Sequence, residues 1–129
     1  MYYEENGAKF YGIPVAKGTT LTEGVVADTC DAVGMRAVCA GDSSCRFYNE
    51  RCQVVDLESS HCDDPMWGLA KKLCGGHPTG CPEMNGLFNY MRDWSGECGV
   101  VNGKMCVKGN SYISDELTVY YAYCVLSIQ

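Results

Sequence analysis

The sequence predicts a small disulfide-rich α+β domain, in which two short helices pack on a mostly antiparallel sheet. Three observations predict this fold class. Ten cysteines occur in 129 residues, a proportion close to that of disulfide scaffolds. Two segments have the apolar spacing of amphipathic helices. In several short segments the side chains alternate between two faces as in a strand, or the residue pairs of tight turns occur.

The length of the chain fits a single domain, because domains typically hold about 100–150 residues. Hydrophobic residues make up 47% of the sequence, which is enough for a packed core. We find no internal repeat and no linker composition. We therefore expect residues 1–129 to form one disulfide-rich extracellular domain, with residues 1–8 as a flexible N-terminal extension.

The cysteines are expected to form disulfides, since their number is even and they are spread along the chain. The closest two, Cys39 and Cys45, have five residues between them, and no C-x-x-C is present, so neither a zinc ribbon nor a thioredoxin motif is indicated. About 945 pairings of ten cysteines exist, and the sequence does not choose among them. The expected participants are Cys30, Cys39, Cys45, Cys52, Cys62, Cys74, Cys81, Cys98, Cys106 and Cys124.

The first expected strand covers residues 9–15, with Tyr11, Ile13 and Val15 on one face. Pro14 cannot donate to a strand ladder, so this segment is expected at a sheet edge or a strand end. A turn is expected at residues 17–19.

A helix is expected next, because Thr20 and Glu23 have the spacing of a capping box and Gly34 is well placed to end it. The apolar stripe of this helix would consist of Val26, Cys30 and Val33. Residues 53–57 are expected to form a short strand.

The second helix is expected to begin with Asp64 as its N-cap and Pro65 at its first position. Gly75 and Gly76 would end it. Its apolar stripe would consist of Met66, Leu69, Ala70 and Leu73.

The C-terminal half is expected to be rich in strands. Residues 87–91 fit either a strand or a helical turn. Residues 99–107 predict a hairpin, because Asn102-Gly103 is a favoured type I′ turn pair. Residues 118–126 alternate in the manner of a strand.

The net charge of −6 would repel nucleic-acid phosphates and anionic lipids, so neither is an expected partner. No apolar run approaches the roughly 20 residues that span a bilayer, so no membrane insertion is expected. The polar opening of the chain lacks the pattern of a signal peptide. We expect a secreted protein in its mature form, or a domain from the extracellular region of a larger protein.

Catalysis is not expected. Ser43 lies in Gly-Asp-Ser-Ser, which is similar to the context of the nucleophile in some serine hydrolases, but a hydrolase needs a positioned histidine base. His61 and His77 are the candidates for that base, and Cys62 beside His61 is the candidate for a thiol nucleophile. A polar loop and a paired cysteine explain the same residues, so we expect no enzyme.

No cofactor is expected, and calcium is the alternative left open. Four carboxylates gather around His61 in the sequence, and oxygen-rich clusters of this kind can hold calcium. They lack the spacing of an EF-hand loop, and capping of the second helix explains two of them. These carboxylates are Asp56, Glu58, Asp63 and Asp64.

Aromatic residues are the feature that points to binding. Nine tyrosines and two tryptophans are present, and both residue types give large contact areas with a polar group attached. Trp94 lies in a polar, turn-prone stretch close to the predicted hairpin. The expected binding residues are therefore Trp94, Tyr90, Asn102 and Tyr112.

From Phe10 to Cys124 the chain resembles a cysteine-rich module of extracellular mosaic proteins that contain EGF-like repeats. The matching segments are KFYGIPV, ADTCDAVGM, GDSSC, DPMWGLAKKLCG, FNYMRDW and the closing YAYC. This resemblance implies an adhesive or recognition role and names no catalytic residue. The helix with Cys30 and the last strand with Cys124 are also similar to C-type lectin-like domains. That family's Glu-Pro-Asn and Trp-Asn-Asp motifs are absent, so its calcium and sugar binding would not carry over.

The sequence thus favours a non-catalytic recognition or adhesion module that binds an extracellular protein or glycan. A stand-alone secreted effector or inhibitor, presenting a disulfide-braced loop at residues 75–80, is the alternative. A small hydrolase is the third possibility. The sequence does not indicate an oligomeric state.

Overall fold

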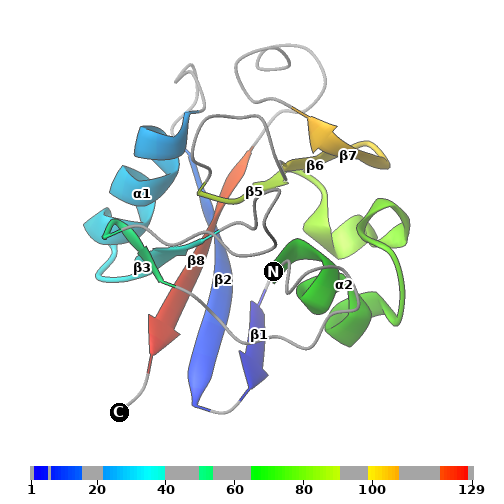
Figure 1. Ribbon diagram of the computed structural model, residues 1–129, viewed down its shortest axis with the longest axis horizontal. Coiled ribbons are helices and arrows are strands. Elements are labelled where there is room, and N and C mark those ends of the chain that lie inside the picture. The colour runs from blue at the N-terminus through cyan, green and yellow to red at the C-terminus, as the bar shows by residue number, and fades with distance from the viewer. Residues whose placement is uncertain are drawn as a thin grey trace.

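The computed structural model describes residues 2–5, 7–15, 22–39, 50–53, 65–90, 99–107 and 120–127. Strands and helices follow one another in the order shown in Figure 1. Their bounds are β1 Tyr2–Glu5, β2 Ala8–Pro14, α1 Glu23–Ala32, β3 Arg36–Val38, β4 Cys52–Gln53, α2 Pro65–Cys74, the 3-10 helices η1 Pro78–Gly80 and η2 Pro82–Met84, β5 Leu87–Phe88, β6 Gly99–Val101, β7 Lys104–Val107 and β8 Tyr121–Ser127.

The main sheet is built around the C-terminal strand β8. Its order is β1-β2-β8-β3-β4, and β5 also pairs with β8. The pairs β1–β2, β2–β8 and β3–β8 are antiparallel, whereas β3–β4 and β5–β8 are parallel. Strands β6 and β7 form a separate antiparallel hairpin. The expected small α+β fold, with two helices and a mostly antiparallel sheet, is therefore confirmed.

The two helices pack on opposite faces of the sheet (Figure 1). Successive residues of a strand point to opposite faces, so alternate side chains of β8 belong to two different buried clusters. Ala122 and Cys124 belong to the buried cluster that contains the α1 residues Val26 and Cys30. Tyr123 and Val125 belong to a second cluster that contains the α2 residues Met66 and Leu69.

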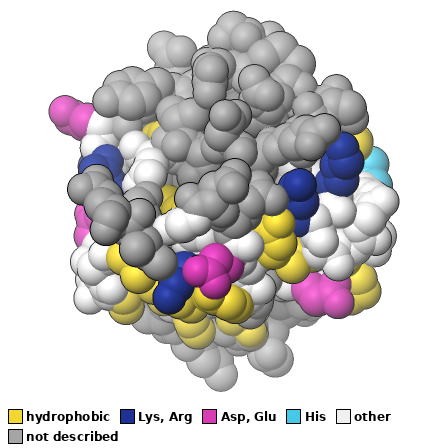
Figure 2. All heavy atoms as spheres, turned by 90° about the horizontal axis from the view of Figure 1, so that it is seen from below, with side chains coloured by type: hydrophobic (Ala, Val, Ile, Leu, Met, Phe, Trp, Pro, Cys, Tyr) yellow, Lys and Arg dark blue, Asp and Glu magenta, His cyan; other side chains and the backbone are white. Residues whose placement is uncertain are grey.

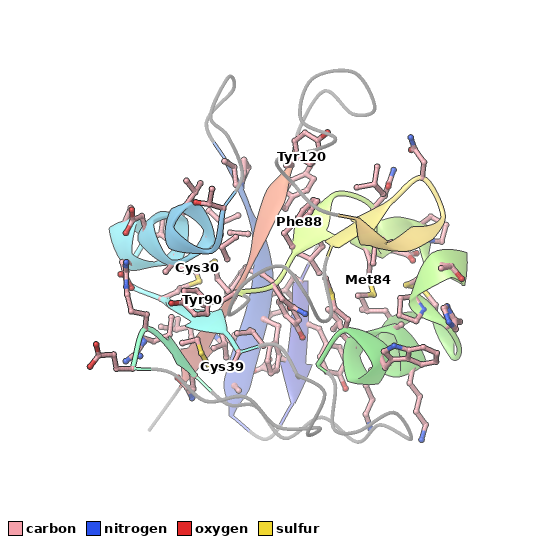
Figure 3. The ribbon with its side chains drawn as sticks, turned by 45° about the horizontal axis from the view of Figure 1, so that its top comes forward. Cys30, Cys39, Met84, Phe88, Tyr90 and Tyr120 are labelled. Carbon is pink, nitrogen blue, oxygen red and sulfur yellow. A yellow bond between two sulfur atoms is a disulfide. The ribbon has the colours of Figure 1, made fainter. Side chains whose placement is uncertain are left out.

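Three disulfides are present in the described part of the chain, and six of the ten expected cysteines take part in them. Cys30–Cys124 joins α1 to β8, Cys39–Cys52 joins β3 to β4, and Cys74–Cys81 joins the end of α2 to the residue between η1 and η2. Cys30, Cys39 and Tyr90 lie on the α1 side of Figure 3, whereas Met84 lies on the α2 side. Cys45, Cys62, Cys98 and the side chain of Cys106 lie outside the described residues.

The start of α1 differs from the expected capping box. The helix begins at Glu23, and its N-cap is Thr22, whose hydroxyl oxygen accepts a hydrogen bond from the Val25 N–H at 3.2 Å. Val26 and Cys30 are buried as expected, but Val33 is 49% exposed. It is the C-cap residue, and Gly34 with a φ of 76° ends the helix there.

The N-terminal residues also differ from expectation. Residues 2–5 form β1 and Ala8 already belongs to β2, so this segment is part of the sheet rather than a flexible extension. As a result β2 lies between β1 and β8 instead of at the sheet edge. Pro14 is its last residue, which is the strand-end alternative.

The other predicted elements are found where the described residues allow a comparison. The helix α2 begins at Pro65 and ends before Gly75. The hairpin turns at Asn102-Gly103 with φ values of 49° and 79°, as a type I′ turn requires. Residues 87–88 are a strand, and of the strand predicted at 53–57 only Gln53, in β4, is described. Residues 17–20, 54–64 and 118–119 lie outside the description.

Asn89 is a buried polar residue that the packing does not explain. It is completely buried, and within the described segments neither its Nδ2 nor its Oδ1 has a hydrogen-bond partner. An unpaired buried amide costs about 1–3 kcal/mol, and an apolar group of similar shape avoids that cost. We expect Asn89→Leu to leave the free energy of unfolding unchanged or raise it by about 1 kcal/mol. Urea denaturation measures this, and a loss of stability would mean that the amide has a partner.

Candidate functional site

The structure places two of the four expected binding residues. Tyr90 is only 7% exposed and belongs to the core cluster beneath α1. Its backbone N–H donates to the Val38 carbonyl at 3.2 Å, which ties Tyr90 to the end of β3. Tyr90 is therefore a core residue with little area for a partner. Trp94 and Tyr112 lie outside the described residues.

Asn102 is exposed at the tip of the β6–β7 hairpin. Its backbone N–H donates to Asn85 Oδ1 at 2.7 Å, and the Asn85 amide approaches its side-chain oxygen at 3.5 Å. These contacts hold the tip beside η1 and η2. A shallow groove of about 280 Å³ runs between them, lined in part by Thr79, Pro82 and Gly103. The hairpin tip is thus an exposed surface that Asn85 holds in place.

The loop at residues 75–80 is closed by the Cys74–Cys81 disulfide, as the effector alternative requires. His77 Nδ1 accepts a hydrogen bond from the Thr79 N–H at 3.1 Å and lies 2.7 Å from the Thr79 hydroxyl. The Trp67 ring meets the His77 ring edge-on, with centroids 4.1 Å apart. These contacts fix the orientation of the exposed histidine. Ser43, His61 and the carboxylates Asp56, Glu58, Asp63 and Asp64 lie outside the described residues.

A third surface, absent from the sites expected from the sequence, lies on the α1 side of the sheet. Residues directly opposite each other in neighbouring strands point to the same face. Tyr2 is opposite Tyr11, which is opposite the buried Cys124, and Glu4 is opposite Lys9, which is opposite Leu126. We call the exposed part of these two rows the tyrosine face. Its members are Tyr2, Glu4, Lys9, Tyr11 and Leu126.

The tyrosine face combines apolar and charged groups at the surface. Helix α1 packs on β8, β3 and the end of β2, and beyond it Tyr2 is 49% and Leu126 38% exposed. Glu4 is exposed, while Lys9 and Tyr11 are half-buried. Seen from below, the molecule likewise exposes hydrophobic side chains beside basic and acidic ones (Figure 2). Single exposed apolar residues are common, but here two tyrosine rings are in contact and Leu126 lies on the same face.

The two tyrosine rings hold each other in place. Their centroids are 5.0 Å apart and their planes are tilted by 50°, within the range of favourable aromatic pairs. The Tyr2 hydroxyl donates a hydrogen bond to Glu4 Oε1 at 3.1 Å. Desolvation and this hydrogen bond raise the pKa of Tyr2 above its usual value. A tyrosine hydroxyl is protonated at neutral pH in any case, because its ordinary pKa is about 10.

Comparison of the chain with family models, with curated proteins and with solved structures gives no match. The described helices include none with the length and apolar character needed to cross a membrane.

A sequence signal for the tyrosine face did exist. Asn6-Gly7 is the same turn pair that correctly predicted the β6–β7 hairpin, and Gly7 has a φ of 81°. Taken as a hairpin turn, it would have paired residues 2–5 with 8–11 and brought Tyr2 opposite Tyr11.

Proposed function

We propose that this domain is a non-catalytic extracellular recognition module that binds a protein partner through the tyrosine face. The observation that supports this most is the exposed Tyr2–Tyr11 ring pair, with Leu126 and the oppositely charged Glu4 and Lys9 beside it. Tyrosine is enriched among the residues that dominate binding energy at protein interfaces. Buried apolar anchors with a charged rim are the usual anatomy of such interfaces.

A sheet supports this role well because its side chains are already ordered. Tyr2 and Tyr11 lie on paired strands, and β2 is held by β8 along its whole length. Few rotamers are lost when such side chains bind, so less of the contact energy is offset by lost entropy. The disulfides found in this small domain agree with an oxidising, extracellular location.

A binding array of secreted proteins and glycans, run with and without calcium, tests this proposal. We expect at least one protein ligand, and we expect Tyr2→Ala/Tyr11→Ala to weaken its binding about tenfold or more. The double variant should remain folded, because Tyr2 is half exposed, and circular dichroism checks this. His77→Ala, on a different surface, is the matched control and should bind as the native chain does.

Three results would contradict the proposal. Binding of glycans alone would exclude the protein partner, and binding that requires calcium would restore the metal alternative. Loss of binding in His77→Ala but not in the double tyrosine variant would favour the effector alternative. The braced loop at 75–80, with its oriented histidine, is the observation that supports this second function.

A further inference from the structure

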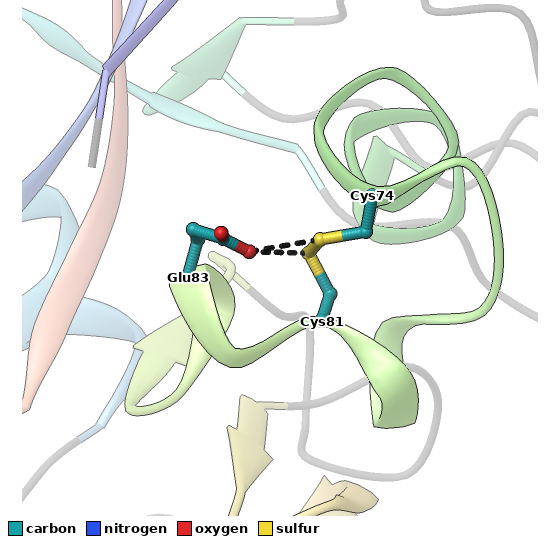
Figure 4. A group of neighbouring side chains, drawn as sticks. All are labelled: Cys74, Cys81 and Glu83. Carbon is teal, nitrogen blue, oxygen red and sulfur yellow. Dashed lines mark hydrogen bonds between the residues drawn. A yellow bond between two sulfur atoms is a disulfide. The ribbon is translucent and has the colours of Figure 1, made fainter.

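The Cys74–Cys81 bridge has a carboxylate against its sulfur atoms. Glu83 Oε2 lies 2.9 Å from Sγ of Cys74 and 3.5 Å from Sγ of Cys81 (Figure 4). The three ligand atoms all lie within 4.8 Å of one another. A disulfide sulfur carries no proton to donate to a carboxylate. Two thiols would donate to it, and two thiolates with a carboxylate would enclose a cation.

We propose that this bridge is open to reduction by a dithiol, and that the reduced Cys74, Cys81 and Glu83 then form a three-ligand site for a thiophilic divalent cation such as Zn²⁺. Two thiolates and a carboxylate are zinc ligands, and three protein ligands with a water in the fourth position form an open tetrahedral site. The proposal concerns a site separate from the tyrosine face, so it does not depend on the proposed function.

The geometry of the bridge suits such a site. The two Cα atoms are 5.6 Å apart. Tetrahedral zinc with Zn–S bonds of about 2.3 Å places its sulfurs about 3.8 Å apart, a separation that rotation of the two side chains supplies. Cys74 is the last residue of α2, where the negative end of the helix dipole favours a cation. Glu83 adds a full negative charge on the facing side.

Accessibility distinguishes this bridge from the other two described disulfides. Cys30 and Cys124 are completely buried, and Cys39 and Cys52 are 4% and 3% exposed. Cys74 instead lies at the molecular surface, although Cys81 is only 2% exposed. Thiol–disulfide exchange requires a thiolate to reach a sulfur. The sulfur of Cys74 is therefore the point of attack.

The exchange proceeds in two steps. A thiolate of the dithiol bonds to Sγ of Cys74, the Cys74–Cys81 bond breaks, and Cys81 leaves as a thiolate. The second thiolate of the reductant then displaces Cys74, so the reductant leaves as a cyclic disulfide after giving two electrons to the protein. At neutral pH the two thiolates take up protons from solvent, and binding of the cation releases those protons again.

Limited reduction of the native chain with dithiothreitol, followed by alkylation and peptide mass spectrometry, tests the first half of the proposal. Cys74 and Cys81 should be labelled before Cys39, Cys52, Cys30 and Cys124. Glu83→Gln should speed this labelling about fivefold, the factor expected for two unit charges about 4 Å apart in water. Earlier labelling of either buried bridge, or an unchanged rate in Glu83→Gln, would overturn it.

Cobalt binding by the selectively reduced chain, freed of reductant without air, tests the second half. We expect one Co²⁺ per chain with the absorption bands of tetrahedral thiolate ligation, displaced by Zn²⁺, and none in the oxidised chain. Glu83→Gln should weaken binding about tenfold or more, whereas Glu50→Gln, a control at an exposed carboxylate, should not. Cys74→Ala/Cys81→Ala, treated identically, should bind none. Undiminished binding in that variant, or none in the native chain, would overturn the proposal.

Discussion

Replacing Cys30 and Cys124 together by alanine is expected to lower the free energy of unfolding by about 4–5 kcal/mol, the largest loss expected for any of the three described disulfides. This disulfide joins residues 94 apart in the sequence, and a loop of about 100 residues gives about 4.7 kcal/mol in the chain-entropy account of cross-links. Both cysteines are completely buried, so their removal also leaves a cavity. A domain stabilised by roughly 5–15 kcal/mol would lose much of its margin.

Cys74→Ala/Cys81→Ala is the matched comparison for that experiment. Its cysteines are seven positions apart in the sequence, a loop for which the chain-entropy account gives about 2–3 kcal/mol. Guanidinium denaturation followed by near-ultraviolet circular dichroism measures both variants. Equal losses of stability would contradict the ranking, because they would mean that neither loop length nor burial decides what a bridge contributes.

Gly99→Ala is expected to lower the free energy of unfolding by about 3 kcal/mol. A Cβ at Gly99 would lie 2.3–2.5 Å from three ring carbons of Phe88. The Phe88 ring cannot easily yield, because it is completely buried and packs edge-on against Tyr120 with centroids 5.7 Å apart (Figure 3). Thermal unfolding measures the loss. Gly76→Ala is the control, since no atom lies within 4 Å of a Cβ built there.

A double-mutant cycle tests whether the loss of stability in Gly99→Ala arises from contact with the Phe88 ring. Phe88→Leu removes part of the ring that the alanine would meet, so Gly99→Ala should cost less in the Phe88→Leu background than in the native chain. Contacting residues typically couple by about 0.5–3 kcal/mol. Additive losses would indicate that Gly99 matters for a reason other than its contact with Phe88.

The elements with strong local signals could be predicted from the sequence. Pro65 at the first turn and Gly75 after the last turn defined α2, and Asn102-Gly103 defined the hairpin. The cap of α1 was predicted at the wrong residue, Thr20, because threonines occur at 19, 20 and 22 and each can cap a helix. The structure selects Thr22, so that Val25 rather than Glu23 supplies the capped N–H.

The pairings between distant segments could not be predicted in this way. Strand β8 pairs with β2 from the beginning of the chain and with β3 and β5 from its middle. No local sequence pattern predicts which residues of these strands lie opposite each other. The same holds for the pairing of the cysteines. Tyr90 illustrates the consequence for the site: it was expected on the binding surface, but the β-bridge between Cys39 and Tyr90 holds it in the core.

Finding the tyrosine face requires both the local sequence and the pairing of distant strands. Its residues come from the two ends of the chain, Tyr2 to Tyr11 and Leu126, and become neighbours only through the β1–β2 and β2–β8 registers. Composition indicated that tyrosines would serve in binding, and the sheet register indicated which ones reach the surface together. The turn pair at Asn6-Gly7 was the only part of this arrangement visible in the local sequence.

Hydroxyl-radical footprinting of the domain with and without a protein ligand found on the array tests the recognition role most directly. Oxidation of Tyr2, Tyr11 and Leu126 should fall in the complex, because their exposed side chains would be covered. Oxidation of Trp67 and His77, on the α2 side, should stay the same. Protection of Trp67 and His77 with unchanged oxidation of Tyr2 and Tyr11 would contradict the assignment of the binding surface to the tyrosine face.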